Sequence, residues 1–97
     1  MYAQVSRVQL LPGTADDWID IARDSILPAA RKVKGFRTAY VLIDRKTNRG
    51  IGISFWETEG DVAAVATSGF YQEQVARWKP CLAAPPEREV YEVAIQP

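Results

Sequence analysis

Two apolar runs of strand length, residues 36 to 44 and 50 to 57, lie in the middle of the chain and constrain its fold most. A polar stretch, Arg45 to Arg49, separates them and ends beside Gly50, as expected of a hairpin loop. A helical pattern lies on each side of this hairpin, and residues 2 to 11 and 87 to 96 have the composition of strands. The 97 residues therefore predict the order β-α-β-β-α-β in one domain, residues 1 to 97.

Capping and breaking residues define the expected helices. The first is predicted over residues 15 to 33, with Thr14 as N-cap and its hydroxyl accepting a bond from a first-turn N–H. Pro28 predicts a kink or break between residues 24 and 28, and Gly35 is the expected C-terminal stop. The second helix is predicted to begin near Glu59, and Ser68-Gly69 divides it into two short helices or one broken helix.

This order predicts an α+β fold of the ferredoxin-like type. Right-handed crossovers place both helices on one face of a four-stranded antiparallel sheet. The other face also reads as apolar: residues 40 to 43 are Tyr-Val-Leu-Ile, and Ile51, Ile53 and Phe55 share one side of the next strand, away from Trp56. An uncovered apolar face is rare in a stable monomer, so we expect a homodimer through the sheet faces. The alternative is that these strands are central and the apolar run is chance.

Composition excludes several functions. Twelve basic residues balance 12 acidic ones, which argues against nucleic-acid or anionic-membrane binding. The chain has no histidine, which removes His general bases and His-ligated metals, and one cysteine, which excludes an internal disulfide. No apolar run approaches the ~20 residues of a membrane span and no targeting pattern is visible, so the default expectation is a cytoplasmic protein. Glu57, Glu59 and Asp61 are interpreted as exposed carboxylates near a helix start, and no metal and no cofactor is predicted.

Segments spread over the whole chain carry a family resemblance: residues 8 to 13, 28 to 31, 35 to 36, 54 to 58, 68 to 71 and 89 to 93. In these the chain resembles the antibiotic biosynthesis monooxygenase (ABM) family, within the dimeric α+β barrel superfamily. The resemblance implies that fold, the dimer, and either cofactor-free oxygenation of aromatic compounds or heme cleavage. Heme-cleaving members use an Asn, a Trp and a His, where this chain has Ser6, Trp56 and, near the His position, Val75. Heme degradation is therefore rejected. The superfamily also holds isomerases and members without assigned activity, so the resemblance does not specify an activity.

The resulting hypothesis is a cofactor-independent monooxygenase that oxidises a small aromatic substrate (quinol, anthrone or polyketide-like) with molecular oxygen. Strand parity places Gln4 and Ser6 beside Trp56 on the helix-facing side. The expected catalytic residues are Trp56 and Ser6, and the expected substrate-binding residues are Gln4, Tyr40, Phe70, Tyr71, Arg77 and Trp78.

Each of these residues also has a packing interpretation: a core tryptophan, aromatic residues at helical spacing, and solvated arginines at positions 37 and 77. The alternative function is a non-catalytic dimeric ligand-binding or scaffold domain. A pocket of several hundred Å3 between sheet and helices would favour binding or catalysis, and a filled interior would favour a scaffold.

Overall fold

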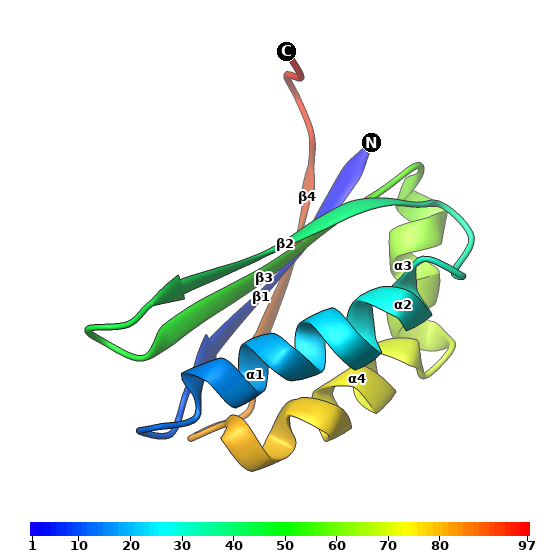
Figure 1. The fold of residues 1–97 in the computed structure, drawn as a ribbon. Helices are drawn as coiled ribbons and strands as arrows, with labels where there is room; N and C mark the ends of the chain where they lie inside the picture. The colour runs from blue at the N-terminus through cyan, green and yellow to red at the C-terminus, as the bar shows by residue number, and fades with distance from the viewer.

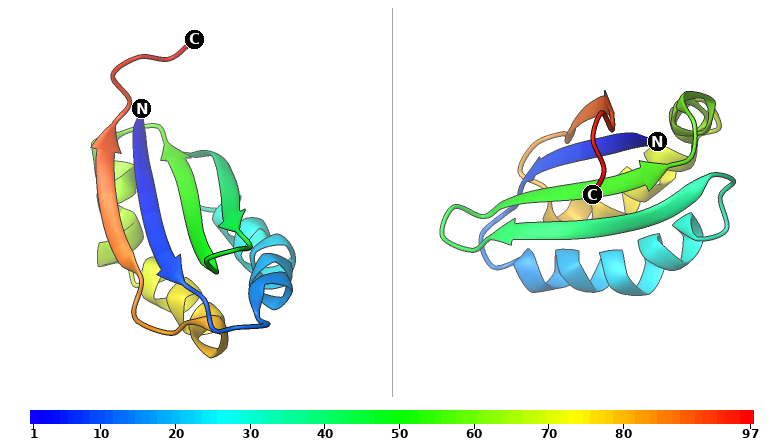
Figure 2. Two further views of the ribbon diagram at one scale, coloured as in Figure 1. Left: turned by 90° about the vertical axis from the view of Figure 1, so that its left-hand side faces the viewer. Right: turned by 90° about the horizontal axis from the view of Figure 1, so that it is seen from above.

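A computed structural model describes residues 1 to 97 and contains one four-stranded antiparallel sheet with its helices on one face (Figure 1). In chain order the elements are β1 (Tyr2–Gln9), α1 (Ala15–Ile21), a π-helical segment (Ala22–Ile26), α2 (Leu27–Ala30), β2 (Phe36–Asp44), β3 (Arg49–Trp56), α3 (Glu59–Thr67), α4 (Phe70–Trp78), a 3₁₀ turn (Lys79–Cys81) and β4 (Glu87–Glu92). The strand order is β2-β3-β1-β4, and the left view of Figure 2 shows the helices behind the sheet. The predicted ferredoxin-like fold is confirmed.

The strand register decides which side chains face the helices. Gln4 lies opposite Ser54, and Ser6 lies opposite Gly52. Because directly opposed residues of an antiparallel pair point to the same side of the sheet, all four lie on the side of Trp56. The predicted parity of Gln4, Ser6 and Trp56 is confirmed. The opposite side, here called the open face, carries the apolar residues Ala3, Val5, Tyr40, Leu42, Ile51, Ile53, Phe55 and Tyr91, together with polar residues that include Arg7, Thr38, Glu87 and Glu89.

The first helical stretch differs from its prediction in two details. Thr14 occupies the N-cap position, but its hydroxyl caps no N–H and instead donates to the carbonyl oxygen of Leu11 at 2.7 Å. The stretch ends at Ala30, three residues before the predicted end. The predicted irregularity between residues 24 and 28 is confirmed, because the π-helical segment occupies residues 22 to 26. Pro28 has no N–H for the carbonyl of Asp24, so the regular α-helical bond cannot form there.

The second helical region is broken where the sequence predicts it. Thr58 caps α3 by accepting a hydrogen bond from the N–H of Asp61 at 3.1 Å. Gly69 has a φ of +85°, a left-handed conformation that ends one helix and turns the chain into α4. The final strand is shorter than predicted: β4 ends at Glu92 rather than at residue 96, and Ile95 is almost fully exposed. No helix of the chain has the length and apolar character needed to span a membrane.

Two apolar clusters hold the helices to the sheet. One surrounds Trp18, which is fully buried and lies 5.3 Å from Trp78 between ring centroids. The other surrounds Trp56, with Val62 and Val65 of α3 packed against it. Cys81 lies in the first cluster, where burial raises the pKa of its thiol. Residues of both clusters, among them Trp78 and Trp56, border the space between the sheet and the helices.

Candidate functional site

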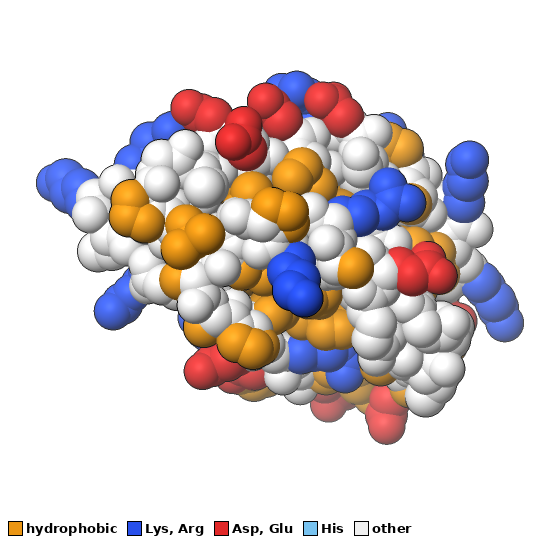
Figure 3. Space-filling model, turned by 90° about the horizontal axis from the view of Figure 1, so that it is seen from below, with side chains coloured by type: hydrophobic (Ala, Val, Ile, Leu, Met, Phe, Trp, Pro, Cys, Tyr) orange, Lys and Arg blue, Asp and Glu red, His pale blue; other side chains and the backbone are white.

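A cavity of about 390 Å3 lies between the helix-facing side of the sheet and the helices. Its wall is mostly apolar, since 16 of its 22 lining residues are hydrophobic. In the space-filling view of Figure 3, hydrophobic side chains gather around the middle of the face formed by the helices, where a Lys or Arg side chain lies among them, and most other charged side chains lie toward the margin. The size and character of this cavity are those of a small-molecule site.

Small residues on β3 create this space. The helix-facing positions of β3 are Gly50, Gly52 and Ser54, ahead of Trp56. A Cβ at Gly50 would lie 2.5 Å from the Trp18 ring, and one at Gly52 would lie 3.2 Å from the Trp78 ring, so the two indoles fill the room beside these glycines. Gly52 and Ser54 line the cavity, and Gly50 does not.

Trp56 forms part of the cavity wall and is only 1% exposed. Its indole N–H donates a hydrogen bond to the Ser54 hydroxyl at 2.9 Å, and the Phe36 ring packs edge-on against it at 5.6 Å. Trp56 is therefore a core residue that also forms part of the cavity wall.

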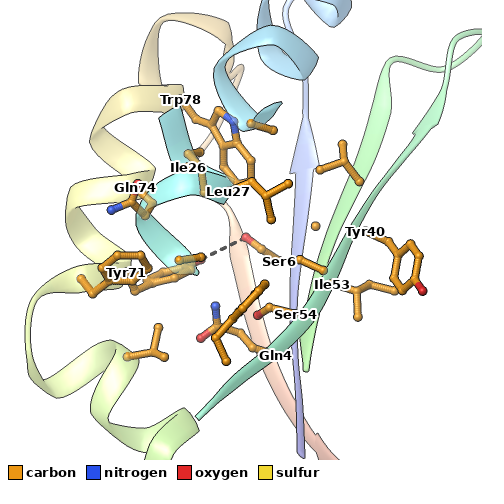
Figure 4. Close-up of a pocket in the computed structure, with 18 of the residues that line it drawn as sticks. Gln4, Ser6, Ile26, Leu27, Tyr40, Ile53, Ser54, Tyr71, Gln74 and Trp78 are labelled. Atoms are coloured by element: carbon orange, nitrogen blue, oxygen red, sulfur yellow. Dashed lines mark hydrogen bonds between the residues drawn. The ribbon is translucent and has the colours of Figure 1, made fainter. Parts of the chain in front are cut away.

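Ser6 and Tyr71 connect the sheet with α4 across the cavity. The Ser6 hydroxyl lies 3.1 Å from the Tyr71 hydroxyl, and either oxygen can be the donor (Figure 4). One of the two hydroxyl hydrogens is used in this bond, so the other is free for a ligand. Phe70 and Trp78 of the same helix also line the cavity. The structure brings Ser6, Phe70, Tyr71 and Trp78 together around one cavity.

Gln4 is held by a residue that sequence reasoning missed. Arg88 of β4 donates from Nε to the Gln4 amide oxygen at 2.7 Å and from Nη2 to the Val62 carbonyl at 3.1 Å. Its guanidinium also lies over the Tyr71 ring, 5.6 Å from the centroid. Arg88 faces the helices opposite Ser6, in phase with Val90. A basic residue in phase with an inward apolar residue is the signal that could have identified it.

The two remaining expected residues differ in their placement. Tyr40 is among the residues that line the cavity, but its ring points to the open face, packs against Phe55 and is 58% exposed (Figure 4). The reason is register, since Tyr40 is paired with Ile53, one residue out of phase with Ser54. Arg77 is exposed on α4 and lines no part of the cavity. Arg37 is likewise exposed and forms an ion pair with Glu57.

Two further polar residues of the site were not foreseen. Ser54 accepts the Trp56 hydrogen bond, and Gln74 of α4 is buried with its amide oxygen unpaired. Gln74 follows Phe70 by four residues, a helical spacing that places both on the face toward the sheet. Arg23 is the charged residue of the lining, and its guanidinium lies at the surface in ion pairs with Asp24 and Asp20.

At the level of sequence, the chain is similar to two curated proteins over part of its length. No family model matches the chain. Two Mycobacterium tuberculosis proteins, the uncharacterized proteins MT2635 and Rv2558, are each 33% identical over 58 residues, which are 60% of this chain. The match spans only 25% of the length of those relatives.

Solved structures share the whole architecture. A putative antibiotic biosynthesis monooxygenase from Bordetella bronchiseptica is 18% identical, with a TM-score of 0.78 over 97% of both chains. NE2512 from Nitrosomonas europaea, a protein of unknown function, is 20% identical, with a TM-score of 0.80 over 99% of this chain and 91% of the other. The Streptomyces coelicolor monooxygenase from ActVA-Orf6, solved with nanaomycin D, is 19% identical, with a TM-score of 0.72 over 99% of this chain and 91% of the other.

The chain thus has a ferredoxin-like α+β fold with a cavity beneath its helices. More particularly, it has the fold of structures named as antibiotic biosynthesis monooxygenases.

Proposed function

We propose that the chain binds a small aromatic molecule with an acidic hydroxyl or an enolisable ketone in this cavity, where molecular oxygen oxidises it without a cofactor. The observation that carries the proposal is the cavity of about 390 Å3, with an apolar wall and a few hydroxyl and amide groups. A scaffold domain has no need of such a space, because empty volume forfeits packing contacts. The structures of similar fold that are named as monooxygenases, one of them with nanaomycin D bound, also support this proposal.

The reaction requires no metal, flavin or heme, because the ionised substrate itself reacts with oxygen. For an anthrone-type ring, loss of a proton gives an enolate that can transfer an electron to oxygen. Overall, one ring CH2 and one O2 give one ring C=O and one water. The cavity supplies a mostly apolar wall that includes Trp56 and Phe70, and one free hydroxyl hydrogen from the Ser6–Tyr71 pair.

Oxygen uptake tests this proposal. Purified protein is incubated with a panel of quinols, anthrones and flavonols, with chelator and without added cofactor. We expect uptake that depends on the protein, saturates with one class of substrate, and falls at least tenfold in Trp56→Phe, because the ring that borders the ligand is smaller and loses its bond to Ser54.

Trp18→Phe is the matched control, since Trp18 is equally buried but lines no part of the cavity. It should keep the uptake rate. Equal loss in both variants would mean that folding, not the site, was tested, and the assignment of Trp56 would be wrong. Tight binding of the panel with no oxygen uptake would favour the alternative, a non-catalytic ligand-binding domain.

We also propose that two copies pair through their open faces. Tyr40, Leu42 and Tyr91 are 58%, 47% and 50% exposed in the single chain, and Ile51, Ile53 and Phe55 lie between them. The strands of a half-exposed antiparallel sheet normally turn polar residues to the solvent, whereas these three β3 residues are all apolar, and polar residues such as Arg7 and Glu89 lie on β1 and β4. A second copy presents an identical apolar face, as a two-fold symmetric interface requires.

Sedimentation at micromolar concentration tests the pairing. The wild type should sediment as a dimer, and Leu42→Glu should sediment as a folded monomer, because it places a charge among the apolar residues of the open face. Ala63→Glu, at an exposed position on α3, is the control and should remain dimeric. A monomeric wild type would refute the pairing.

A further inference from the structure

We infer that Gln4 and Ser54 form an oxyanion-binding site in the cavity, oriented by Arg88, and that the ligand is held there as its phenolate or enolate. The inference rests on the proposed function, since it concerns the same cavity. It adds the ionisation state of the bound molecule and three residues with assigned roles. Gln4 and Ser54 contact the ligand oxygen, and Arg88 is a positioning residue behind them.

Arg88 fixes which end of the Gln4 amide faces the cavity. A guanidinium can only donate hydrogen bonds, so the atom that it contacts at 2.7 Å must be the Gln4 oxygen. The Gln4 NH2 group is therefore turned the other way, and it has no partner within the chain. Gln4 is 8% exposed and lines the cavity, so these two N–H bonds are available to a ligand.

Ser54 is a donor to the cavity for a similar reason. The Trp56 indole N–H can only donate, so at 2.9 Å the Ser54 oxygen must be its acceptor. The Ser54 hydroxyl hydrogen is then free for another acceptor. Trp56 thus orients the Ser54 hydroxyl, as Arg88 orients the Gln4 amide.

The two donors are neighbours on one wall. Gln4 and Ser54 are directly opposed residues of β1 and β3, and side chains at such positions begin about 5 Å apart. Figure 4 shows the Gln4 nitrogen and the Ser54 and Ser6 oxygens on the same side of the sheet. The Ser6–Tyr71 pair adds one further hydroxyl hydrogen nearby. Such a convergence of donors matches a ligand oxygen that carries negative charge.

The charge of Arg88 favours the same ligand. Arg88 is the only one of the 12 basic residues that is not solvent-exposed. Its contacts are the Gln4 amide, the Val62 carbonyl and the Tyr71 ring, all of them uncharged, and no carboxylate lies within ion-pair distance. A half-buried cation without a counterion is costly, and an anion in the adjacent cavity offsets that cost.

The step on the ligand is a simple ionisation. The O–H bond of the phenol, or the C–H bond beside the ketone, breaks; the electron pair stays on the ligand, and the proton leaves to water. Nothing is oxidised or reduced in this step. Stabilising the anion lowers the ligand's own pKa, which supplies the reactive form without a strong base in the wall.

A coloured phenol that cannot be oxidised further tests the inference apart from turnover. We choose 2-hydroxyanthraquinone, whose phenolate absorbs at longer wavelength than its neutral form, and titrate it with pH in the presence of saturating protein. The bound probe should ionise at a pH at least one unit below that of the free probe, a tenfold or larger preference for the anion. Gln4→Met and Ser54→Ala should each remove a large part of this shift.

Arg88→Met should remove most of the shift, and Arg88→Lys should restore part of it, because the charge returns without the forked contact to Gln4 and Val62. Arg77→Met, an exposed arginine outside the cavity, is the matched control and should leave the shift unchanged. Thermal melts confirm that each variant is folded, and the Ser54→Ala titration keeps the test open should Arg88→Met unfold.

The outcomes separate the two proposals. A bound probe that ionises like the free one, or variants that match the wild type, would overturn the oxyanion site while leaving aromatic binding intact. Binding as the anion, combined with no oxygen uptake from any oxidisable substrate, would support the oxyanion site and refute the oxygenation. Failure of the wild type to bind any aromatic probe would overturn both.

Discussion

Replacing Gly50 with alanine tests how tightly β3 packs on the helices. The new Cβ would lie 2.5 Å and 2.8 Å from two Trp18 ring carbons and 3.0 Å from a Val8 methyl. Ordinary carbon contacts are about 3.5 to 4.0 Å, so a gap of about 1 Å must open. Trp18 has no exposed surface and packs on Trp78, so its ring cannot swing out to relieve the contact.

The magnitude follows from two opposing terms. Overpacking of a rigid core costs about 1 to 3 kcal/mol, and this contact belongs at the upper end because a ring must move rather than a flexible chain end. Loss of glycine's freedom in the unfolded state returns about 0.4 to 1 kcal/mol. We therefore expect Gly50→Ala to lower the free energy of unfolding by about 2 kcal/mol, or roughly 8 to 16 °C in Tm for a domain of this size.

Urea and thermal denaturation measure the effect, and Gly60→Ala is its control. A Cβ at Gly60 meets only the Thr58 hydroxyl oxygen, at an ordinary 3.8 Å, and the position lies in the first turn of α3. That variant should be more stable than the wild type by up to about 1 kcal/mol, from helix propensity. If Gly50→Ala proved as stable as the wild type, the packing of Trp18 against β3 described above would be wrong.

Three further predictions concern other parts of the chain. Thr58→Ala removes the hydroxyl that accepts from the Asp61 N–H and should lower the free energy of unfolding by about 1 kcal/mol in urea denaturation. Hydrogen bonds from the Tyr91 hydroxyl and the Arg7 guanidinium hold the pKa of Glu89 below its ordinary 4.5. The Glu89 carboxylate therefore stabilises the fold above pH 4.5, and this contribution is lost as the pH falls. The stability difference between the wild type and Glu89→Gln should therefore shrink below pH 4.5 in a pH series of urea melts, and a constant difference would contradict the assignment. Cys81 is 3% exposed, with a pKa raised by burial, so its labelling by a disulfide reagent at pH 8 should be slow in buffer and fast in urea.

Local patterns were sufficient to predict most of the fold. The hairpin, the helix break at Ser68-Gly69 and the irregularity before Pro28 each rest on one or two residues whose backbone chemistry permits few conformations. The last strand was predicted too long because residues 93 to 96 alternate like a strand. Among these residues only Val93 donates a backbone hydrogen bond to the adjacent chain segment, to the Met1 carbonyl at 2.9 Å, and the pattern alone does not carry that information.

The site was predicted less completely, because side-chain positions there depend on register. Parity placed Gln4, Ser6 and Trp56 correctly relative to one another. Tyr40 lines the cavity, but the direction of its ring was not predicted, because parity within one strand does not fix its phase relative to the neighbouring strand. Arg88 was missed because it contacts Gln4, a residue 84 positions away in sequence, and no local pattern links the two.

The residues of β3 relate the two proposals to each other. From Gly50 to Phe55 the strand alternates Gly-Ile-Gly-Ile-Ser-Phe, so all of its bulk lies on the open face and almost none on the helix-facing side. An apolar side chain at Ser54 would occupy the cavity and leave the Trp56 N–H without its acceptor, whereas a polar one at Ile53 would interrupt the open face. Packing within the chain explains Gly50 and Gly52, because the Trp18 and Trp78 rings lie against them. It does not explain Ser54, which is polar on the inner side, or the large apolar residues on the outer side, which in a single chain would be polar.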